Sequence, residues 1–512
     1  MAGRETAARR KRGQESQKAA LAAILQKIDV FSNQSKDSVS VLGGTTNVMY
    51  WESILSDSVR ATVTFTDAGN TLRTTKNTRR GRRPTTKKVS AVEGLPIEGS
   101  EEVYLKFQDN DGNTLDFGKR NNNSLYVNQV IDIPTGSESG DKTYMLDLAP
   151  LEWITNEKGG QQVRKVFSGQ ISDHVRTIFK DVLKTKKNLD IEETKSTLDF
   201  CGNNTKPYYT LNDLSTKAVS KYIQGEGATA GYFFWETTYA YHFKSIDNLM
   251  GQGDKKKIIY NESAEGLPPS YNVKALELET NNQVNVQKKL QMGAYSNRFL
   301  GFNPLSMEWT NSLTEAEKNE RDDMIELAGE KLPTLNKRFN LDEADSEFSR
   351  SSLQFITTGQ LNVGKIDGQL DKSKEINFDA PKIFNQAVMR YNQLFASQVT
   401  TVIPGDFSLH AGDSVWVDMP QIDVTEKKAC GDEVNRETGG SYLITDLCHY
   451  ITSSDTYTKL VLTRDSFGRK GSPDREKGVL VKTMGGVDLN PSNMTKEEIY
   501  EGVPKSGGGN FL

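Results

Sequence analysis

The chain has 512 residues, which predicts several domains, roughly three or four at the usual domain size. Its 64 basic and 68 acidic side chains leave a formal net charge of −4, which argues against a protein that coats nucleic acid over its whole surface. No run reaches the about 18 apolar residues needed to cross a bilayer, so stable membrane insertion is not expected.

The first 35 residues predict an N-terminal helical arm. A basic cluster at residues 9–12 precedes a short apolar run, which superficially resembles a signal peptide, but polar residues separate the two parts. Leu21, Leu25 and Ile28 recur at helical spacing. This spacing favours an amphipathic helix that docks onto this protein or a neighbour.

A basic stretch follows the strand pattern that runs from Val39 to Asp67. Residues 70–90 carry eight positive charges and no acid, interleaved with Thr, Asn and Gly, and therefore predict a solvated loop. The charged residues of this basic loop are Arg73, Lys76, Arg79, Arg80, Arg82, Arg83, Lys87 and Lys88. One interpretation is a loop that faces an anion, such as nucleic acid in a channel or an acidic partner chain. The alternative is a surface loop whose charges merely keep it solvated; the composition also matches a nuclear localisation cluster.

A strand-like alternation occurs twice in the chain. Its residues are Ile97, Gly99, Val103 and Leu105 in the earlier copy, and Leu409, Gly412, Val415 and Val417 in the later copy. The step from Tyr126 to Leu146 equals the step from Tyr442 to Leu462. Such self-similarity favours two copies of one supersecondary unit, here two small β-barrels or sandwiches. The alternative, that any two β-meanders share so loose a pattern, stays open.

The segments around these copies predict the remaining domains. Between the copies, apolar residues of 171–183 fall on one helical face, a second helix begins with a capping box at Thr210, and a hairpin turns at residues 237–238. Strand-like residues 273–303 start the later copy, a charged helix runs from Thr314 toward Lys331, and residues 384–404 return to strand. The expected division is an arm at 1–35, a first barrel at 36–155, an α/β insert at 156–270, a second barrel at 271–310 and 381–470, a helical excursion at 311–380, and a flexible C-terminal tail at 471–512.

The residues that usually carry catalysis show no catalytic pattern. The histidines His174, His242, His410 and His449 fall in four different elements and are interpreted as structural. No zinc-protease, nucleophile-elbow or phosphate-loop motif is present, and paired acids such as Glu101-Glu102 fit chance adjacency better than a glycosidase. No enzyme activity, catalytic residue or cofactor is expected.

Three cysteines, Cys201, Cys430 and Cys448, are an odd number without metal-ligand spacing. They predict reduced thiols in a reducing compartment, and no metal ion is expected.

The order of arm, barrel, α/β insert, second barrel and tail resembles the baseplate hub proteins of contractile-tailed bacteriophages. The stretch Leu409–Val417, which opens the second barrel's strand pair, takes part in this resemblance. Residues 50–55, 231–236 and 241–247 are also similar to the hub proteins of large phages of the T-even type. The resemblance covers residues 36 to 470 and leaves out the arm, the basic loop and the tail.

The resemblance implies a mainly β, multidomain chain with α+β insertions, containing two tube-type antiparallel β-barrels. Three such chains would close into a homotrimeric ring with pseudo-sixfold symmetry, joining the hexameric tail tube to the trimeric spike and leaving a channel for DNA. The implied partners are tail tube or tube-initiator proteins and a separate spike protein. The basic loop, which has no counterpart in the resemblance, is a candidate contact for the passing genome or for wedge or tape-measure proteins. The implied location is the virion baseplate, assembled in the host cytoplasm.

Two other functions remain open at this point. The first is a tail-tip adhesin or tail-associated binding protein of a non-contractile phage. The second is a peptidoglycan hydrolase at the tail tip, which cell-wall degradation by the purified protein would reveal.

Overall fold

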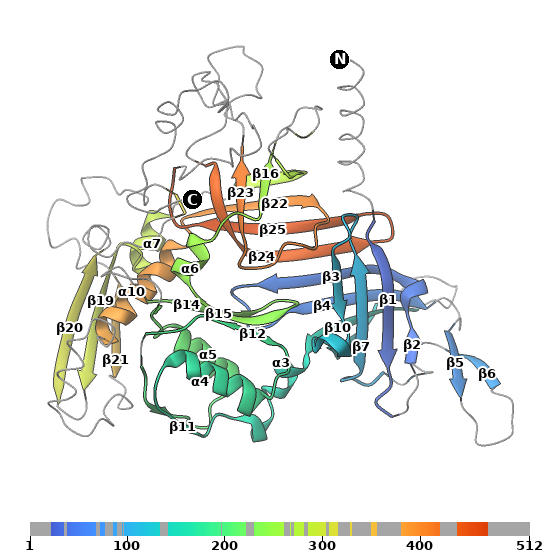
Figure 1. Cartoon of the computed structure of the whole chain (residues 1–512), viewed down its shortest axis with the longest axis horizontal. Coiled ribbons are helices and arrows are strands. Elements are labelled where there is room, and N and C mark those ends of the chain that lie inside the picture. The colour runs from blue at the N-terminus through green and yellow to red at the C-terminus, as the bar shows by residue number, and fades with distance from the viewer. Residues whose placement is uncertain are drawn as a thin grey trace, which may run out of the picture.

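The computed structural model describes residues 22–34, 38–67, 72–76, 85–89, 95, 97–133, 142–195, 197–221, 230–260, 267, 271–280, 285–303, 307–315, 328–329, 350–355, 380–419 and 438–468. Within these residues the chain is mainly β, and most strands join one sheet of fifteen strands (Figure 1). A smaller α/β part and a separate three-stranded sheet lie beside it. The predicted mainly β fold with α+β parts is confirmed.

The large sheet contains two rows of seven strands, which we name the first unit and the second unit. In the order of pairing, the first unit consists of β3 (Thr45–Ser53), β4 (Arg60–Asp67), β10 (Lys142–Pro150), β9 (Leu125–Ile133), β7 (Glu102–Gln108), β1 (Ile24–Phe31) and β2 (Ser38–Ser40). The second unit consists of β18 (Glu277–Thr280), β22 (Ser397–Pro404), β25 (Thr456–Arg464), β24 (Gly440–Thr452), β23 (Ser414–Asp418), β16 (Lys256–Ile259) and β17 (Val273–Lys274). The fifteenth strand, β8 (Thr114–Phe117), pairs with β7.

Alternating side chains bury one face of each unit. In β4, Ala61, Val63 and Phe65 are buried while the residues between them are half-buried, which is the period-2 pattern of a strand with one face on a core. The first unit and the second unit each have their own cluster of buried apolar side chains. Burial of these faces supplies the main free energy that holds each unit together.

The two units share details of pairing beyond their strand order, which confirms the duplication. In the first unit, Val127 pairs with Leu148 and Gln129 with Asp147, so one residue of β9 bulges. In the second unit, the same bulge occurs in β24 between the pairs Ile444–Leu462 and Asp446–Val461. A one-residue bulge at matching places is a specific feature and not a general property of β-meanders.

The equal spacing of Tyr126–Leu146 and Tyr442–Leu462 predicted that these residues correspond in the two units, and this prediction is wrong. The bulges align Val127 with Ile444 and Leu148 with Leu462, so the hairpin of the first unit is the longer one. The units also differ in the direction of one strand pair: β7 pairs antiparallel with β1, whereas the corresponding strand β23 pairs parallel with β16. The pairings of the described strands close no ring, so the predicted barrels are not confirmed.

The α/β part between the units carries a three-stranded sheet in the order β12 (Asn188–Ile191), β15 (Ala240–Ser245) and β14 (Tyr232–Glu236). Helix α4 (Ile171–Thr177) continues as a π-helix, η4 (Ile178–Leu183), and packs with α5 (Pro207–Ser215) against this sheet (Figure 1). The predicted helical face and hairpin are confirmed. The helix expected from Thr210 begins earlier, at Pro207, whose fixed φ suits the first helical position.

The remaining short elements connect these parts. They are η1 (Leu42–Gly44), η2 (Lys119–Asn121), α3 (Leu151–Thr155), η3 (Gly159–Gln161), the pair β11 (Val166–Phe167) and β13 (Phe200–Cys201), α6 (Ile246–Gly251) and α7 (Val286–Met292).

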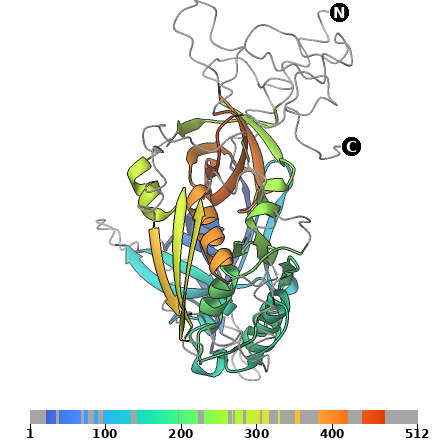
Figure 2. The same ribbon diagram turned by 90° about the vertical axis from the view of Figure 1, so that its left-hand side faces the viewer.

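A separate sheet contains β20 (Glu308–Glu315), β19 (Ser296–Asn303) and β21 (Arg350–Phe355), with helix α10 (Ala380–Gln393) against it (Figure 2). Two predictions fail here. The charged helix expected from Thr314 is wrong at its start, because Thr314 and Glu315 end strand β20, and residues 316–327 lie outside the described residues. The strand expected over 384–404 is a helix as far as Gln393, and only Ser397–Pro404 forms a strand.

The spacing of buried residues explains α10. Ile383, Ala387 and Arg390 of α10 are buried at helical intervals, whereas a strand of the same residues would divide them between two faces. Strand β19 was expected in the second unit but belongs to this separate sheet, and β16 was expected in the α/β insert but pairs with β23.

The predicted helical arm is wrong over residues 24–31, which form strand β1. Ile28 and Val30 are both fully buried in the first unit, and β1 pairs with β7 and β2. Pairing with two neighbours outweighed a weak local helical pattern. The basic cluster at residues 9–12, like the tail at 471–512, lies outside the described residues. Among the described residues, no helix is both long enough and apolar enough to cross a membrane.

Candidate functional site: the junction between the units

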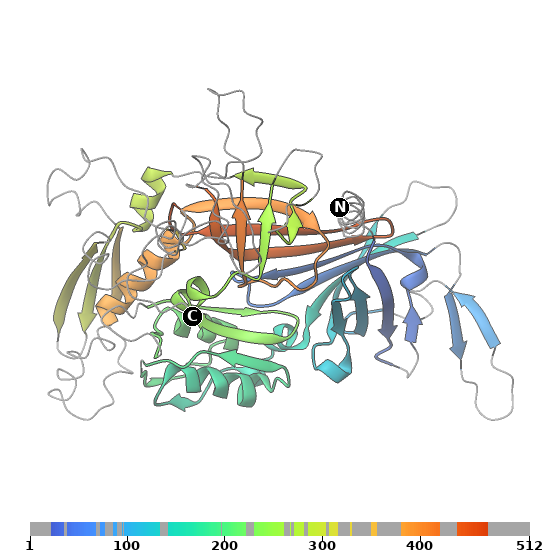
Figure 3. The ribbon, with the colours of Figure 1, turned by 45° about the horizontal axis from the view of Figure 1, so that its top comes forward.

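The two units meet edge to edge in one continuous sheet (Figure 3). Strand β24 pairs with β25 along one edge, while its other edge is divided: its first residues pair with β23 and its last residues with β3 of the first unit. The register of β24 with β3 runs antiparallel from Asp446–Ser53 to Thr452–Asn47. Main-chain hydrogen bonds therefore fix the position of one unit on the other.

An apolar cluster lies where the α/β part meets both units. It contains Ile54, Phe233, Trp235, Ile246, Leu249, Leu394, Ala411 and Leu443. These side chains lie in or directly beside the first unit, the α/β part, helix α10 and the second unit, so none of the four parts forms this core alone.

Glu52 of β3 ties the three larger parts together at this junction. Its side chain is 1% exposed, and its carboxylate accepts hydrogen bonds from the Thr238 amide (2.9 Å) and the Ala411 amide (3.0 Å). Tyr50 donates its hydroxyl to the same carboxylate at 2.7 Å, and His410 Nδ1 lies 3.1 Å from both carboxylate oxygens. A buried carboxylate with this many donors is held in its charged form.

The pKa values of this cluster follow from burial and pairing. Burial alone would raise the pKa of Glu52, but the charge of His410 and the hydrogen bonds from His410, Tyr50 and Thr238 outweigh it and lower the pKa to about 2. Burial would lower the pKa of His410, yet the charge of Glu52 raises it above the ordinary value. The two groups therefore form a buried ion pair.

Trp235 of the α/β part packs directly against Gly412 of the second unit. The indole Nε1 of Trp235 donates to the carbonyl of Ala411 at 3.0 Å. Gly412 has φ of +91°, and a Cβ there would lie 2.6 Å from the indole ring. Only glycine satisfies both the backbone conformation and the space at this turn.

A second buried ion pair lies in the α/β part, where that part contacts the first unit. Lys187 Nζ lies 2.7 Å from the Glu236 carboxylate, and the two side chains are 3% and 1% exposed. The Val59 amide, just before β4, donates to the other oxygen of Glu236 at 3.1 Å. Burial raises the pKa of Glu236 while Lys187 opposes that rise, so the charged form depends on its lysine partner.

His242 lies between a carboxylate and a hydroxyl, as in a nucleophilic triad. Its Nδ1 is 3.0 Å from Asp190 Oδ2 and its Nε2 is 2.9 Å from Thr237 Oγ1. A nucleophilic hydroxyl must reach its substrate, however, and Thr237 is 3% exposed while the Trp235 ring stacks on the imidazole at 4.8 Å. The arrangement therefore fits fixation of the hairpin turn.

The other histidines and acidic pairs have structural surroundings. His174 is buried with its Nε2 2.7 Å from the Leu198 carbonyl, and burial lowers its pKa. His449 is fully buried beside Thr458, and burial lowers its pKa to about 3. Glu101 accepts the amides of Glu98 and Gly99. These contacts agree with the interpretation of both histidines as structural.

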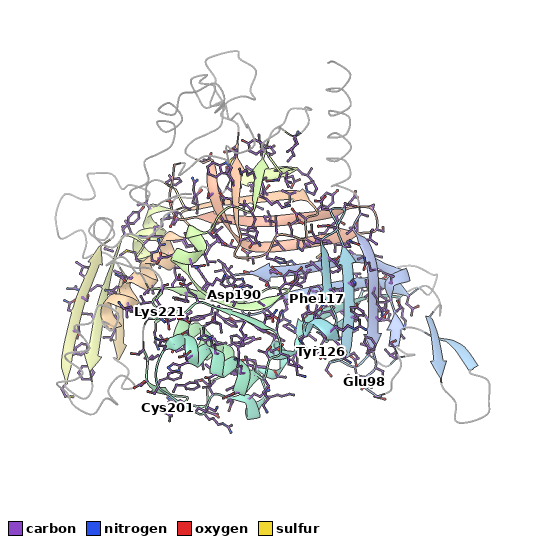
Figure 4. The ribbon with its side chains drawn as sticks, in the orientation of Figure 1. Glu98, Phe117, Tyr126, Asp190, Cys201 and Lys221 are labelled. Atoms are coloured by element: carbon purple, nitrogen blue, oxygen red, sulfur yellow. The ribbon has the colours of Figure 1, made fainter. Side chains whose placement is uncertain are left out.

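The described residues contain no group of side chains arranged to hold a metal ion. Cys201 is exposed at the outer end of the α/β part (Figure 4), whereas Cys448 is half-buried, and burial raises its pKa to about 11. Cys430 lies outside the described residues. The prediction that the chain is not an enzyme stays a prediction.

The basic loop is in part a β-hairpin. Strands β5 (Leu72–Lys76) and β6 (Thr85–Val89) pair antiparallel, with Arg73 opposite Lys88 and Lys76 opposite Thr85, and the pair extends outward beside β2 (Figure 1). The expectation of a loop throughout is therefore wrong for the two flanks, because a ribbon satisfies backbone hydrogen bonds without a core. Arg79, Arg80, Arg82 and Arg83 lie at residues outside the described part of the chain.

Sequence reasoning missed Glu52 and its partners. The available signal was a carboxylate in the alternating strand of β3 at a position that the pattern assigns to the buried face. Such a residue needs buried donors, but sequence alone does not show that His410 and Thr238 supply them.

No protein family matches this chain, and no curated protein matches it. Among solved structures, it is similar to the 43 kDa tail protein of prophage MuSo2 from Shewanella oneidensis, with 8% identity, a TM-score of 0.44, and coverage of 86% of this chain and 99% of that one. It is also similar to the tail protein from Neisseria meningitidis MC58, with 8% identity, a TM-score of 0.43, and coverage of 86% and 96%. A third similar structure is prophage tail protein gp18 from Listeria monocytogenes EGD-e, with 9% identity, a TM-score of 0.40, and coverage of 86% and 94%. With TM-scores below 0.5, these likenesses carry no conclusion about this chain's function.

Proposed function

We propose that this chain is a structural component of a phage tail baseplate, the central hub that joins a hexameric tail tube to a trimeric spike. Three copies form a ring around a channel through which DNA passes. The ring binds tail tube or tube-initiator proteins on one side and a separate spike protein on the other, with wedge or tape-measure proteins as further partners. It belongs to the virion and assembles in the host cytoplasm.

The observation that carries this proposal is the pair of like units paired edge to edge in one chain. Both units have the same order of seven strands and the same bulge, and β24 of one unit pairs with β3 of the other. Two similar units in each of three chains give six similar positions around one axis. A ring of this kind matches sixfold symmetry on one face and threefold symmetry on the other.

The interior of the chain also supports a structural role. Two buried carboxylates, Glu52 and Glu236, accept hydrogen bonds that join the first unit, the α/β part and the second unit. Within the described residues, they hold parts of the chain together and present no exposed reactive group. Buried carboxylates with fixed donors favour one arrangement of the parts over others.

The basic hairpin is proposed to face DNA in the channel or an acidic partner chain. Changing Arg79, Arg80, Arg82 and Arg83 to Gln removes four of the eight charges of this stretch. We expect impaired assembly or DNA delivery in a phage carrying this variant. Normal infectivity would return the hairpin to a surface segment whose charges serve only solvation.

Native mass measurement of the purified full chain tests the ring directly. We expect a homotrimer whose share grows with protein concentration or on addition of the neighbouring tail proteins. A monomer under all of these conditions would contradict the hub and leave the tail-tip adhesin as the better explanation. Localising the chain on the particle axis, in a low-resolution map, would test the position between tube and spike.

A further inference from the structure

We propose that neighbouring copies in the ring join by strand pairing, β9 of one copy with β18 of the next. This inference rests on the proposed homotrimer and names the surfaces that build it. The contact between the two units inside one chain is the template for the contact between chains.

The contact inside the chain has a donor strand and an acceptor edge. The acceptor is the last part of β24, from Asp446 to Thr452, which lies beyond the residues that pair with β23. The donor is β3, which is the outermost strand in the row of the first unit. At this contact Tyr50 and His449 face each other across the two strands and are both fully buried.

The matching acceptor in the first unit is the last part of β9. The bulges align Gln129 with Asp446, so the residues from Gln129 to Ile133 correspond to the part of β24 that receives β3. Strand β7 pairs with β9 only at Leu125 and Tyr126, just as β23 pairs only with the start of β24. In the described part of the chain, no strand pairs with residues 129–133 on the edge away from β10.

The matching donor in the second unit is β18. Strand β4 corresponds to β22, because each pairs with the outer edge of its hairpin, and β3 and β18 are then the next strands outward. The pairs Ala61–Tyr50 and Val399–Thr280 occupy the same place in the two rows. Among the described strands, β18 pairs with β22 alone, and Glu277, Glu279 and Thr280 are exposed.

Within the described residues, each copy therefore carries one acceptor edge and one donor edge of matching design, and neither edge pairs with another strand. Strand edges of this kind present main-chain donors and acceptors that readily pair with another strand. Because the acceptor and the donor are different surfaces, the contact is head-to-tail, and such contacts generate closed rings when the rotation between units permits. A second copy of this chain is the partner whose shape the internal contact already specifies.

The internal register predicts the register between copies. The pairs His449–Tyr50 and Tyr450–Met49 correspond to Asp132 opposite Thr280 and Ile133 opposite Glu279. The amide of Ile54 donates to the carbonyl of Thr445, so these two residues form a hydrogen-bonded pair. Hydrogen-bonded and non-hydrogen-bonded pairs alternate along an antiparallel ladder, which makes Tyr450–Met49 a non-hydrogen-bonded pair. Ile133 and Glu279 would thus face each other as a non-hydrogen-bonded pair, with Cα atoms about 4.5 Å apart. That distance suits a disulfide bond.

The test is oxidative cross-linking of the full-length double variant Ile133→Cys, Glu279→Cys, with Cys201 and Cys430 changed to Ala. We expect a covalent trimer on a non-reducing gel that returns to monomer on reduction. The matched control carries Ile133→Cys with Leu353→Cys, an exposed position on the separate sheet. The control should give no covalent trimer.

Native mass measurement of the same samples separates the two proposals. If the native measurement shows a trimer but the double variant gives no more covalent trimer than the control, the β9–β18 contact is overturned and the homotrimer is not. A monomer at every concentration, in both variants and in the unmodified chain, would contradict the homotrimer itself.

Discussion

Replacing Glu52 by Gln removes one charge from the junction and keeps the shape of the side chain. The carboxyl pKa falls from an ordinary 4.5 to about 2. At about 1.4 kcal/mol per pKa unit, this shift corresponds to ~3 kcal/mol in favour of the charged form. We expect Glu52→Gln to lower the local stability of the junction by that amount at pH 7, because His410 and two backbone amides lose their charged acceptor.

Hydrogen exchange measured by mass spectrometry reports this loss at the site itself. The amides of Thr238 and Ala411 donate to Glu52 and belong to different parts of the chain. A loss of ~3 kcal/mol would speed their exchange by roughly a hundredfold where exchange follows local opening. The matched control is Glu157→Gln, which removes one partner of the ion pair between the exposed side chains of Glu157 and Lys206 and should leave the exchange of both amides nearly unchanged.

The pH dependence gives a second check with a definite sign. Because the pKa of Glu52 is depressed in the folded chain, its contribution is present above pH 4.5 and is lost as the pH falls toward 2. The Gln variant lacks this titration. The reasoning would be refuted if the amides of Thr238 and Ala411 exchanged at the same rate in Glu52→Gln and in the unmodified chain at pH 7.

Three further predictions concern packing, the second ion pair and thiol reactivity. Gly412→Ala should destabilise the chain by ~3 kcal/mol in thermal or urea unfolding, because φ is +91° there and a Cβ would lie 2.6 Å from the indole of Trp235. The control Gly253→Ala should have little effect, because a Cβ there would meet no atom within 4 Å. Lys187→Met should lower the stability by about 3–5 kcal/mol at pH 7, because it leaves the buried carboxylate of Glu236 without its partner. Burial raises the pKa of Glu236, so part of the stability should return as the pH is lowered and the carboxyl becomes neutral. Urea titrations at several pH values would measure this recovery. Iodoacetamide at pH 8 should alkylate exposed Cys201 much faster than Cys448, because burial raises the pKa of the Cys448 thiol to about 11. Peptide mass spectrometry measures both rates, and equal rates would contradict the burial of Cys448.

Local patterns in the sequence were sufficient where one element buries one face against its own neighbours. The alternation in β4 predicted a strand, and the helical face at residues 171–183 predicted the helix pair of the α/β part. The repeat of strand patterns predicted the duplication, although only the bulges gave its alignment. The patterns failed for residues 24–31 and 384–393, where partners distant in sequence decided between strand and helix.

By itself, the sequence determined that the chain is mainly β, that a β unit occurs twice, and that a small α/β part lies between the copies. These features follow from hydrophobic periodicity, which each segment carries on its own. Only the tertiary structure decided how the copies meet: which half of β24 receives β3, and which donors surround Glu52. The reason is physical, since the partners in these contacts are separated by hundreds of residues and backbone hydrogen bonds between strand edges leave no mark on side-chain pattern.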